Sequence, residues 1–79
     1  MKVQILGMGC PKCKQLEANA REAASALSLE AEFEKIADMD AIMDMGVMMT
    51  PALAVDGEVK SAGKLLTADQ ISAILKEAL

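Results

Sequence analysis

The sequence KVQILGMGCPKC, residues Lys2–Cys13, joins a strand pattern to a helix pattern and places two cysteines at the junction. The apolar, β-rich run Lys2–Leu6 predicts a buried strand. Gly7 interrupts that run, and Pro11 favours the φ angle of a first helical turn. Cys10 and Cys13 are the chain's two cysteines. This placement is compatible with a redox couple, a soft-metal ligand pair or a structural disulfide.

The position of Cys10 favours thiol–disulfide exchange. Unpaired N–H groups and the helix dipole at a helix N-terminus favour negative charge, which lowers the pKa of a thiol there and populates the reactive thiolate. Lys12 and Lys14 add positive charge nearby. Cys13 follows one helical turn later, so we predict Cys10 as the attacking cysteine and Cys13 as the resolving one. A structural disulfide would close too small a loop to restrict the unfolded chain much.

The rest of the chain predicts further strands and helices in the order β-α-β-α-β-β-α. Small apolar residues at three- and four-residue steps predict an amphipathic helix from about Pro11 to Leu27. Period-two alternation over Leu29–Ile36 predicts a strand near a sheet edge. A Thr-x-x-Gln capping box at Thr67 opens the last helix. Between these elements we predict a short helix from Asp38 to about Gly46 with Ile42 and Met43 inward, a strand at Pro51–Val55, an Asp56-Gly57 hairpin turn and a partner strand at Glu58–Ala62.

Composition limits the functions open to the chain. Its 79 residues make one domain, residues 1–79. The formal charge of −4 and the absence of Trp and Tyr argue against nucleic-acid binding, which uses basic stripes or stacking rings. No apolar run approaches the roughly 20 residues of a membrane span, and the first run is too short for a secretory signal. We therefore expect no nucleic-acid or membrane partner and a cytoplasmic location, where a CxxC pair is typically redox-active or metal-binding.

Two further signals follow the short helix. Five of the seven methionines fall within residues 39–49, and adaptable core filler is a more typical use of such residues than a docking surface or a copper-loading strip. Met48 and Met49 are the members most expected to be exposed. Thr50 and Pro51 then open a strand. A proline there is ordinarily a strand boundary, but a cis proline would turn neighbouring backbone groups toward an extended partner chain.

Taken in order, CPKC after the first strand, the segment GVMMTPALAVDG, the hairpin and the last helix resemble the thioredoxin-like superfamily. The match is closer still to its small redox-active disulfide proteins, and it covers essentially the whole chain. The resemblance implies an α/β fold of the minimal thioredoxin-like type, with a four-stranded mixed sheet flanked by helices. It also implies that Cys10 lies at an exposed helix tip and that Pro51 is cis and faces the disulfide.

The function implied by this resemblance is that of a small thiol–disulfide oxidoreductase, an enzyme or electron carrier that reduces protein disulfides through Cys10 and Cys13. A thioredoxin-reductase-like enzyme, linked to NADPH or to ferredoxin, would reduce it again. The exchange itself needs no metal and no bound cofactor. The residues predicted to bind substrate are Pro11, Lys12, Met49, Thr50 and Pro51.

The sequence departs from the thioredoxin pattern in three places. Gly-Met-Gly precedes Cys10 where thioredoxins carry an aromatic residue, and Pro-Lys replaces Gly-Pro between the cysteines. Gln4 falls roughly where thioredoxins keep a buried carboxylate that helps to move a proton from the resolving thiol. The chain contains no His that would serve as a proton shuttle instead.

GMGCPKC also resembles the GMxCxxC loop of heavy-metal-associated domains, which carry Cu(I) or Zn(II), and two thiolates suit a soft metal ion. Those domains run β-α-β-β-α-β and finish on a strand, whereas TADQISAILKEAL predicts a capped helix as the last element here. A soft-metal binding or carrier domain is therefore the alternative to the redox function. A closed zinc site needs more ligands than two cysteines supply.

Overall fold

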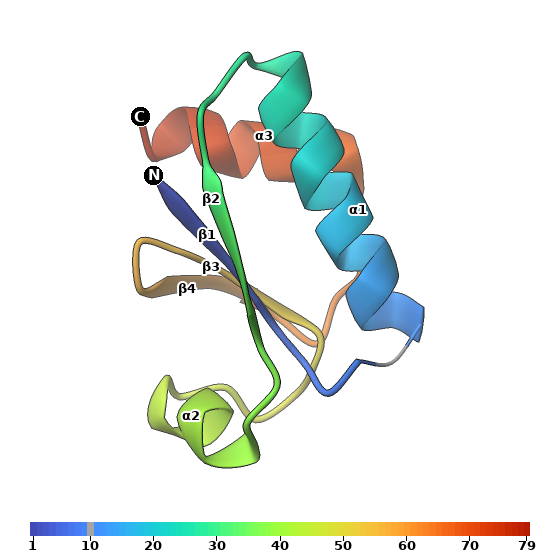
Figure 1. Ribbon diagram of the computed structural model, residues 1–79, viewed down its shortest axis with the longest axis vertical. Coiled ribbons are helices and arrows are strands. Elements are labelled where there is room, and N and C mark those ends of the chain that lie inside the picture. Colours follow the sequence, from blue (N-terminus) through green and yellow to red (C-terminus); the bar gives the residue numbers. More distant parts are fainter. Residues whose placement is uncertain (10) are drawn as a thin grey trace.

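The computed structural model describes residues 1–9 and 11–79, and the elements within them follow the predicted order (Figure 1). The first strand leads into the longest helix, and a β-hairpin precedes the last helix. In chain order the elements are β1 (Lys2–Leu6), α1 (Pro11–Ala26), β2 (Glu32–Ile36), α2 (Met39–Asp44), β3 (Ala52–Val55), β4 (Glu58–Ala62) and α3 (Ala68–Glu77).

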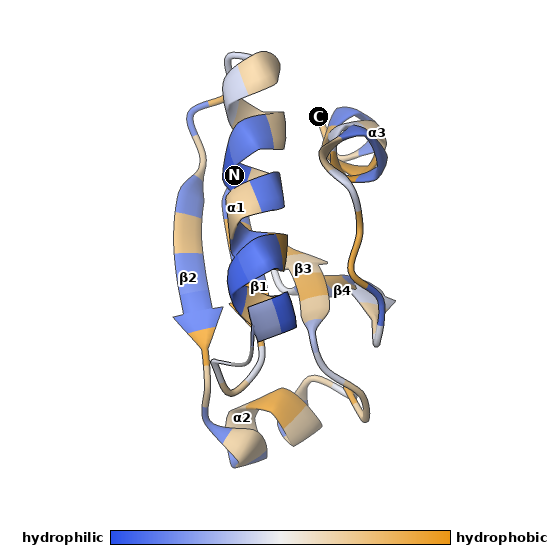
Figure 2. Cartoon of the chain, turned by 90° about the vertical axis from the view of Figure 1, so that its right-hand side faces the viewer, coloured by the Kyte–Doolittle hydropathy of each residue, from blue (hydrophilic) through white to orange (hydrophobic). Residues whose placement is uncertain are grey.

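The described strands form a four-stranded mixed sheet in the order β2-β1-β3-β4. β1 pairs in parallel with β2 and antiparallel with β3, and β3 pairs antiparallel with β4. This sheet with its helices confirms the predicted α/β fold of the minimal thioredoxin-like type. β2 lies at an edge, as its alternating sequence predicts, and Figure 2 shows it as largely hydrophilic. The inner strand β3 is apolar and buried along its whole length.

Alternate residues of β1 and β3 point into two cores on opposite faces of the sheet. Burying each large apolar side chain contributes roughly 1.5–3 kcal/mol, so the larger core dominates stability. That larger core joins α1 and α3 to the sheet and contains Val3, Ile5, Leu16, Ala20, Ala23, Ala24, Leu53, Val55, Leu66, Ile71 and Leu75. The smaller core joins α2 to the other face and contains Leu6, Ile42, Val47, Ala52 and Ala54.

Side-chain caps fix the first turns of α2 and α3. The Thr67 hydroxyl accepts a hydrogen bond from the Gln70 backbone N–H at 3.2 Å, and the Gln70 side chain accepts one from the Thr67 N–H at 2.9 Å. The predicted capping box is therefore present. Asp38 caps α2 in a similar way by accepting from the Asp40 N–H at 3.1 Å. Within the described part of the chain, none of the helices has the length and apolar character needed to cross a membrane.

Two details differ from the prediction. β2 begins at Glu32 rather than at Leu29, because Ser28 and Leu29 complete the C-terminal turn of α1. Ser28 adopts a φ of 53°, and the Leu29 N–H donates to the Ala24 carbonyl at 2.9 Å. Met43, predicted to point inward, is exposed, because the six-residue α2 buries Ile42 alone.

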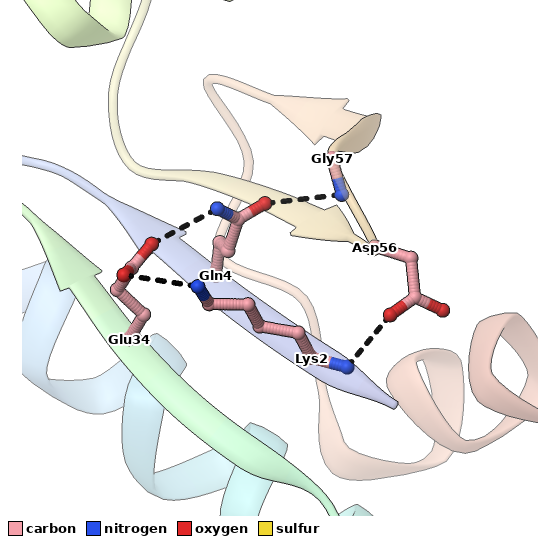
Figure 3. Close-up of polar contacts among 5 residues, drawn as sticks. All are labelled: Lys2, Gln4, Glu34, Asp56 and Gly57. Carbon is pink, nitrogen blue, oxygen red and sulfur yellow. Dashed lines mark hydrogen bonds and ion pairs between the residues drawn. The ribbon is translucent and has the colours of Figure 1, made fainter.

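A polar network on the sheet face opposite α1 joins β1 to β2 and to the turn between β3 and β4 (Figure 3). Gln4 donates to Glu34 Oε1 at 3.0 Å and accepts from the Gly57 N–H at 3.2 Å. The Lys2 ammonium lies 3.2 Å from Glu34 Oε2, and the Lys2 N–H donates to Asp56 at 2.8 Å. Hydrogen bonds from Gln4 and then Lys2 lower the pKa of Glu34. Asp56 and Gly57 both have positive φ values, 51° and 85°, which confirms the predicted hairpin turn.

Candidate functional site

Three segments meet at the N-terminal end of α1: the end of β1, the first turn of α1 and the residue before β3. Gly7 lies between Cys13 and Pro51, and the space at its Cα has no room for a side chain. A Cβ on Gly7 would overlap Cys13 Sγ, and it would lie 3.9 Å from Pro51 Cα. The absence of a side chain therefore lets these segments approach closely. The fold brings Cys13 and Pro51 together although they lie far apart in the sequence.

The first turn of α1 separates exposed residues from a buried thiol. Pro11 and Lys12 open the helix and are exposed to solvent. Cys13 is only 5% exposed and faces the sheet. Cys10 lies outside the described residues, so its predicted place at an exposed helix tip stays a prediction. Burial of Cys13 is the arrangement expected for a resolving thiol, which must be reached by a neighbouring sulfur rather than from solvent.

The segment before β3 contains Pro51 and the two exposed residues that precede it. The Thr50–Pro51 peptide bond is cis, as the resemblance implied. Pro51 is buried, and its carbonyl accepts a hydrogen bond from the Gly63 N–H at 2.9 Å. Met49 and Thr50 are exposed, and a Cβ on Gly63 would lie 3.0 Å from Met49 Cβ. Gly63, directly after β4, thus packs against Met49 and is hydrogen-bonded to Pro51.

A small pocket beside Cys13 contains an ion pair that sequence reasoning missed. Glu17, one turn further along α1, has a side chain only 14% exposed and lies 3.1 Å from Lys35 Nζ of β2 and 2.9 Å from Arg21. Hydrogen bonding by Lys35, and then by Arg21, lowers the pKa of Glu17 despite its partial desolvation. The i, i+4 spacing of Cys13 and Glu17 is the signal that would have placed them on one helix face. The pocket is lined by Cys13, Glu17, Lys35, Ile5, Gly7, Gly9, Lys14 and Ala37.

Gln4 does not lie beside the resolving thiol, so the expectation drawn from the resemblance is wrong at this position. Its side chain points to the face opposite α1, where it bonds to Glu34 and Gly57 (Figure 3). Side chains alternate along a strand, so Ile5 is the β1 residue that faces α1 and lines the Cys13 pocket.

Most of the methionine cluster lies on the surface. Met39, Met43, Met48 and Met49 are 51%, 62%, 96% and 65% exposed. The favoured assignment as core filler is therefore wrong for Met39 and Met43. Ile42 and Val47 fill the space beneath α2 instead, and Met45 packs partly against them. The exposure of Met48 and Met49 agrees with the prediction for those two residues.

Comparison with known proteins decides the family. A family model described as a thioredoxin domain matches residues 1–76. The chain belongs to the thioredoxin domain family. This thioredoxin domain is 51% identical over 75 residues to a thioredoxin of Methanothermobacter thermautotrophicus, a match that covers 95% of this chain and 97% of the other. It is 35% identical over 77 residues to a thioredoxin of Methanocaldococcus jannaschii, with 98% and 88% covered.

The thioredoxin domain is accordingly a small thiol–disulfide oxidoreductase, a class that exchanges electrons with disulfide substrates and with a reductase. The soft-metal alternative gains no support from these relatives. Across residues 1–9 and 11–79, no group of three or more His, Cys, Asp or Glu side chains is arranged to hold a metal ion.

Proposed function

We propose that this thioredoxin domain reduces protein disulfides, with Cys10 attacking and Cys13 resolving. The Cys10 thiolate attacks one sulfur of the substrate disulfide, forms a mixed disulfide and releases the other substrate sulfur as a thiolate. The Cys13 thiolate then attacks the Cys10 sulfur and releases the second substrate thiolate. Two electrons pass to the substrate, and the Cys10–Cys13 pair is left as a disulfide.

The observation that carries this assignment is the burial of Cys13 against Gly7 in the first turn of α1. Cys13 as a whole is only 5% exposed, so a bulky substrate disulfide in solvent has little access to its sulfur. A mixed disulfide formed by the other cysteine of the CPKC motif would instead bring its sulfur within reach of Cys13. The order of attack follows from this difference in access.

Five residues around the pair are proposed to bind the substrate. Met49 and Thr50 are exposed, directly precede Pro51 and offer a side chain and backbone groups to an extended segment. Pro51 is buried and acts by positioning them. Pro11 and Lys12 extend the contact on the side of α1, where both are exposed.

The oxidised domain must recover two electrons before the next cycle. We propose that a thioredoxin-reductase-like enzyme, linked to NADPH or to ferredoxin, supplies them by exchange with the Cys10–Cys13 disulfide. The cycle is placed in the cytoplasm, where reducing systems keep such thiols available. Residues 1–79 act as one domain, and no step draws on a metal or a bound cofactor.

Single serine variants test the roles of the cysteines. Cys13→Ser is expected to accumulate a mixed disulfide with a peptide disulfide, because nothing resolves the first adduct, whereas Cys10→Ser is expected to form none on the same timescale. Mass spectrometry of the trapped species gives the result. In the same variants, alkylation by iodoacetamide at neutral pH should be faster at Cys10. Faster alkylation of Cys13 would reverse the two roles.

A further inference from the structure

A groove lies beside the redox site, between the loop after β1, the helix α2 and residues 46–50. Its floor is Ile42 and Val47, both buried. We call this surface the methionine groove and define it by Met8, Met39, Met43, Val47, Met48 and Thr50.

The side chains that line the groove suit an apolar partner segment. Its four methionines are all more than half exposed to solvent. Scattered apolar side chains are ordinary on a protein surface, but a contiguous group of them marks a contact site. Methionine is unbranched and polarizable, so it adapts to partners of different shape. The methionine groove therefore offers an apolar contact without a strict shape requirement.

The methionine groove is continuous with the redox site at two points. Thr50 directly precedes Pro51, which lies across Gly7 from Cys13. Met8 directly follows Gly7 at the other side. A chain segment that reaches the sulfurs and continues toward α2 must therefore cross the groove.

The charges around the methionine groove determine which charged side chains of a partner segment are attracted to it. Residues 38–50 contain three carboxylates, Asp38, Asp40 and Asp44, and no Lys or Arg. All three are exposed, and none of the ion pairs among residues 1–9 and 11–79 includes them. On the other side of the redox site, Lys12 and Lys14 are exposed on α1. The α2 side thus has a negative potential that the α1 side lacks.

We propose that the methionine groove binds a segment of the protein substrate in which apolar residues are interspersed with Lys or Arg, adjoining the cysteine that is reduced. The inference rests on the proposed function and adds the class of substrate to it. Apolar side chains contact the methionines, and the basic side chains face the carboxylates of α2. Complementary charges of this kind chiefly raise the rate of encounter and fix the orientation of the bound segment.

The test compares three peptide disulfides of equal length with the reduced full-length chain. They share one disulfide, and the flanking segment is apolar with Lys, apolar with Glu, or Ser with Lys. Second-order rate constants for reduction are expected to favour the apolar Lys peptide by about tenfold over the Glu peptide at low salt. That preference should shrink in 1 M salt, where charges are screened within about 3 Å.

Two variants and a matched control locate the effect. Asp38→Asn/Asp40→Asn/Asp44→Asn keeps an N-cap residue at position 38 and should reduce the preference for Lys over Glu to less than about threefold. Met43→Gln/Met48→Gln should remove the preference for the apolar Lys peptide over the Ser one. The control Glu22→Gln/Glu58→Gln/Glu77→Gln removes the same charge from exposed sites elsewhere and should retain both preferences.

Hydroxyethyl disulfide separates this inference from the proposed function, because it has no segment to occupy the groove. All variants should reduce it at the wild-type rate, and failure of the wild type to do so would sink the proposed function itself. Equal rates for the three peptides, or preferences that survive both groove variants, would overturn the groove inference alone. The groove inference would also be overturned if the wild type forms a dimer in sedimentation velocity and Met43→Gln/Met48→Gln abolishes that dimer. A second copy of the chain would then occupy the groove.

Discussion

Replacing Gly7 with alanine adds one methyl group where β1, α1 and the Met49–Pro51 segment meet. The φ angle of Gly7 lies outside the left-handed region, so alanine fits its backbone conformation. The new Cβ, however, would overlap Cys13 Sγ and lie 3.2 Å from Cys13 Cβ. Cys13 is buried, so its sulfur can move only into the small pocket that it lines with Glu17 and Lys35. The methyl group must therefore displace the thiol or separate α1 from β1.

The size of the effect follows from two opposing contributions. An extra methyl group in a well-packed site costs about 1–3 kcal/mol. Alanine restricts the unfolded chain more than glycine does, which offsets about 0.4–1 kcal/mol. We expect a net loss of about 1–2 kcal/mol in the free energy of unfolding for Gly7→Ala. With an m-value of about 1 kcal/mol/M for a small domain, the urea midpoint falls by about 1–2 M.

Urea denaturation of the reduced protein, followed by circular dichroism, measures the stability loss, and the rate of peptide disulfide reduction measures the effect on exchange. Displacing the resolving sulfur by about 1 Å is expected to slow turnover by tenfold or more. Gly57→Ala is the matched control: Gly57 has a φ of 85° and no atoms within 4 Å of a Cβ, so alanine strains the distant hairpin without touching the thiol. Wild-type midpoint and rate in Gly7→Ala would refute the close packing of Gly7 on Cys13.

Three further outcomes are expected. Folding lowers the pKa of Glu17 from 4.5. The ionised Glu17 carboxylate therefore stabilises the fold above that pH, and this contribution is lost as the pH falls through the lower pKa of the folded state. Urea titrations from pH 3 to 7 should show this loss in the wild type and not in Glu17→Gln. Thr67→Ala removes the capping box of α3 and should cost about 1 kcal/mol in the same assay, whereas Thr67→Ser should cost little; equal stability of the two would contradict the cap. Leu53→Ala in the larger core should cost about 2–5 kcal/mol, against less than about 0.5 kcal/mol for the exposed Leu65→Ala, and similar losses for both would argue against the assigned burial.

The elements with a local physical cause were predictable from the sequence. Thr67 and Gln70 satisfy each other's backbone groups whatever the rest of the chain does, so the start of α3 was evident before the fold was known. The positive φ angles of the hairpin turn suit Asp56 and Gly57 for the same local reason. β2 started later than predicted because Leu29, the first residue of the alternating segment, takes part in the turn that ends α1.

The candidate site also combines local features, which the sequence predicts, with features that depend on packing. CPKC at the start of a helix is a local pattern that suits a redox pair or a soft-metal site, and the capped helix expected at the end of the chain favoured the redox pair. The ion pair of Glu17 with Lys35 was not predictable, because it joins α1 to β2 and depends on how the two pack. Gln4 was misplaced because a likeness in strand position did not fix which face of the sheet its side chain would take.

By itself, the sequence determined the order of strands and helices, their caps and turns, and the cysteine pair, since each depends on residues within about one turn of one another. Tertiary structure alone decided that Gly7 would let Cys13 pack near Pro51, and that four methionines would remain outside a core already filled by Ile42 and Val47. These features depend on the space left between distant segments. That space is fixed only when the segments pack together.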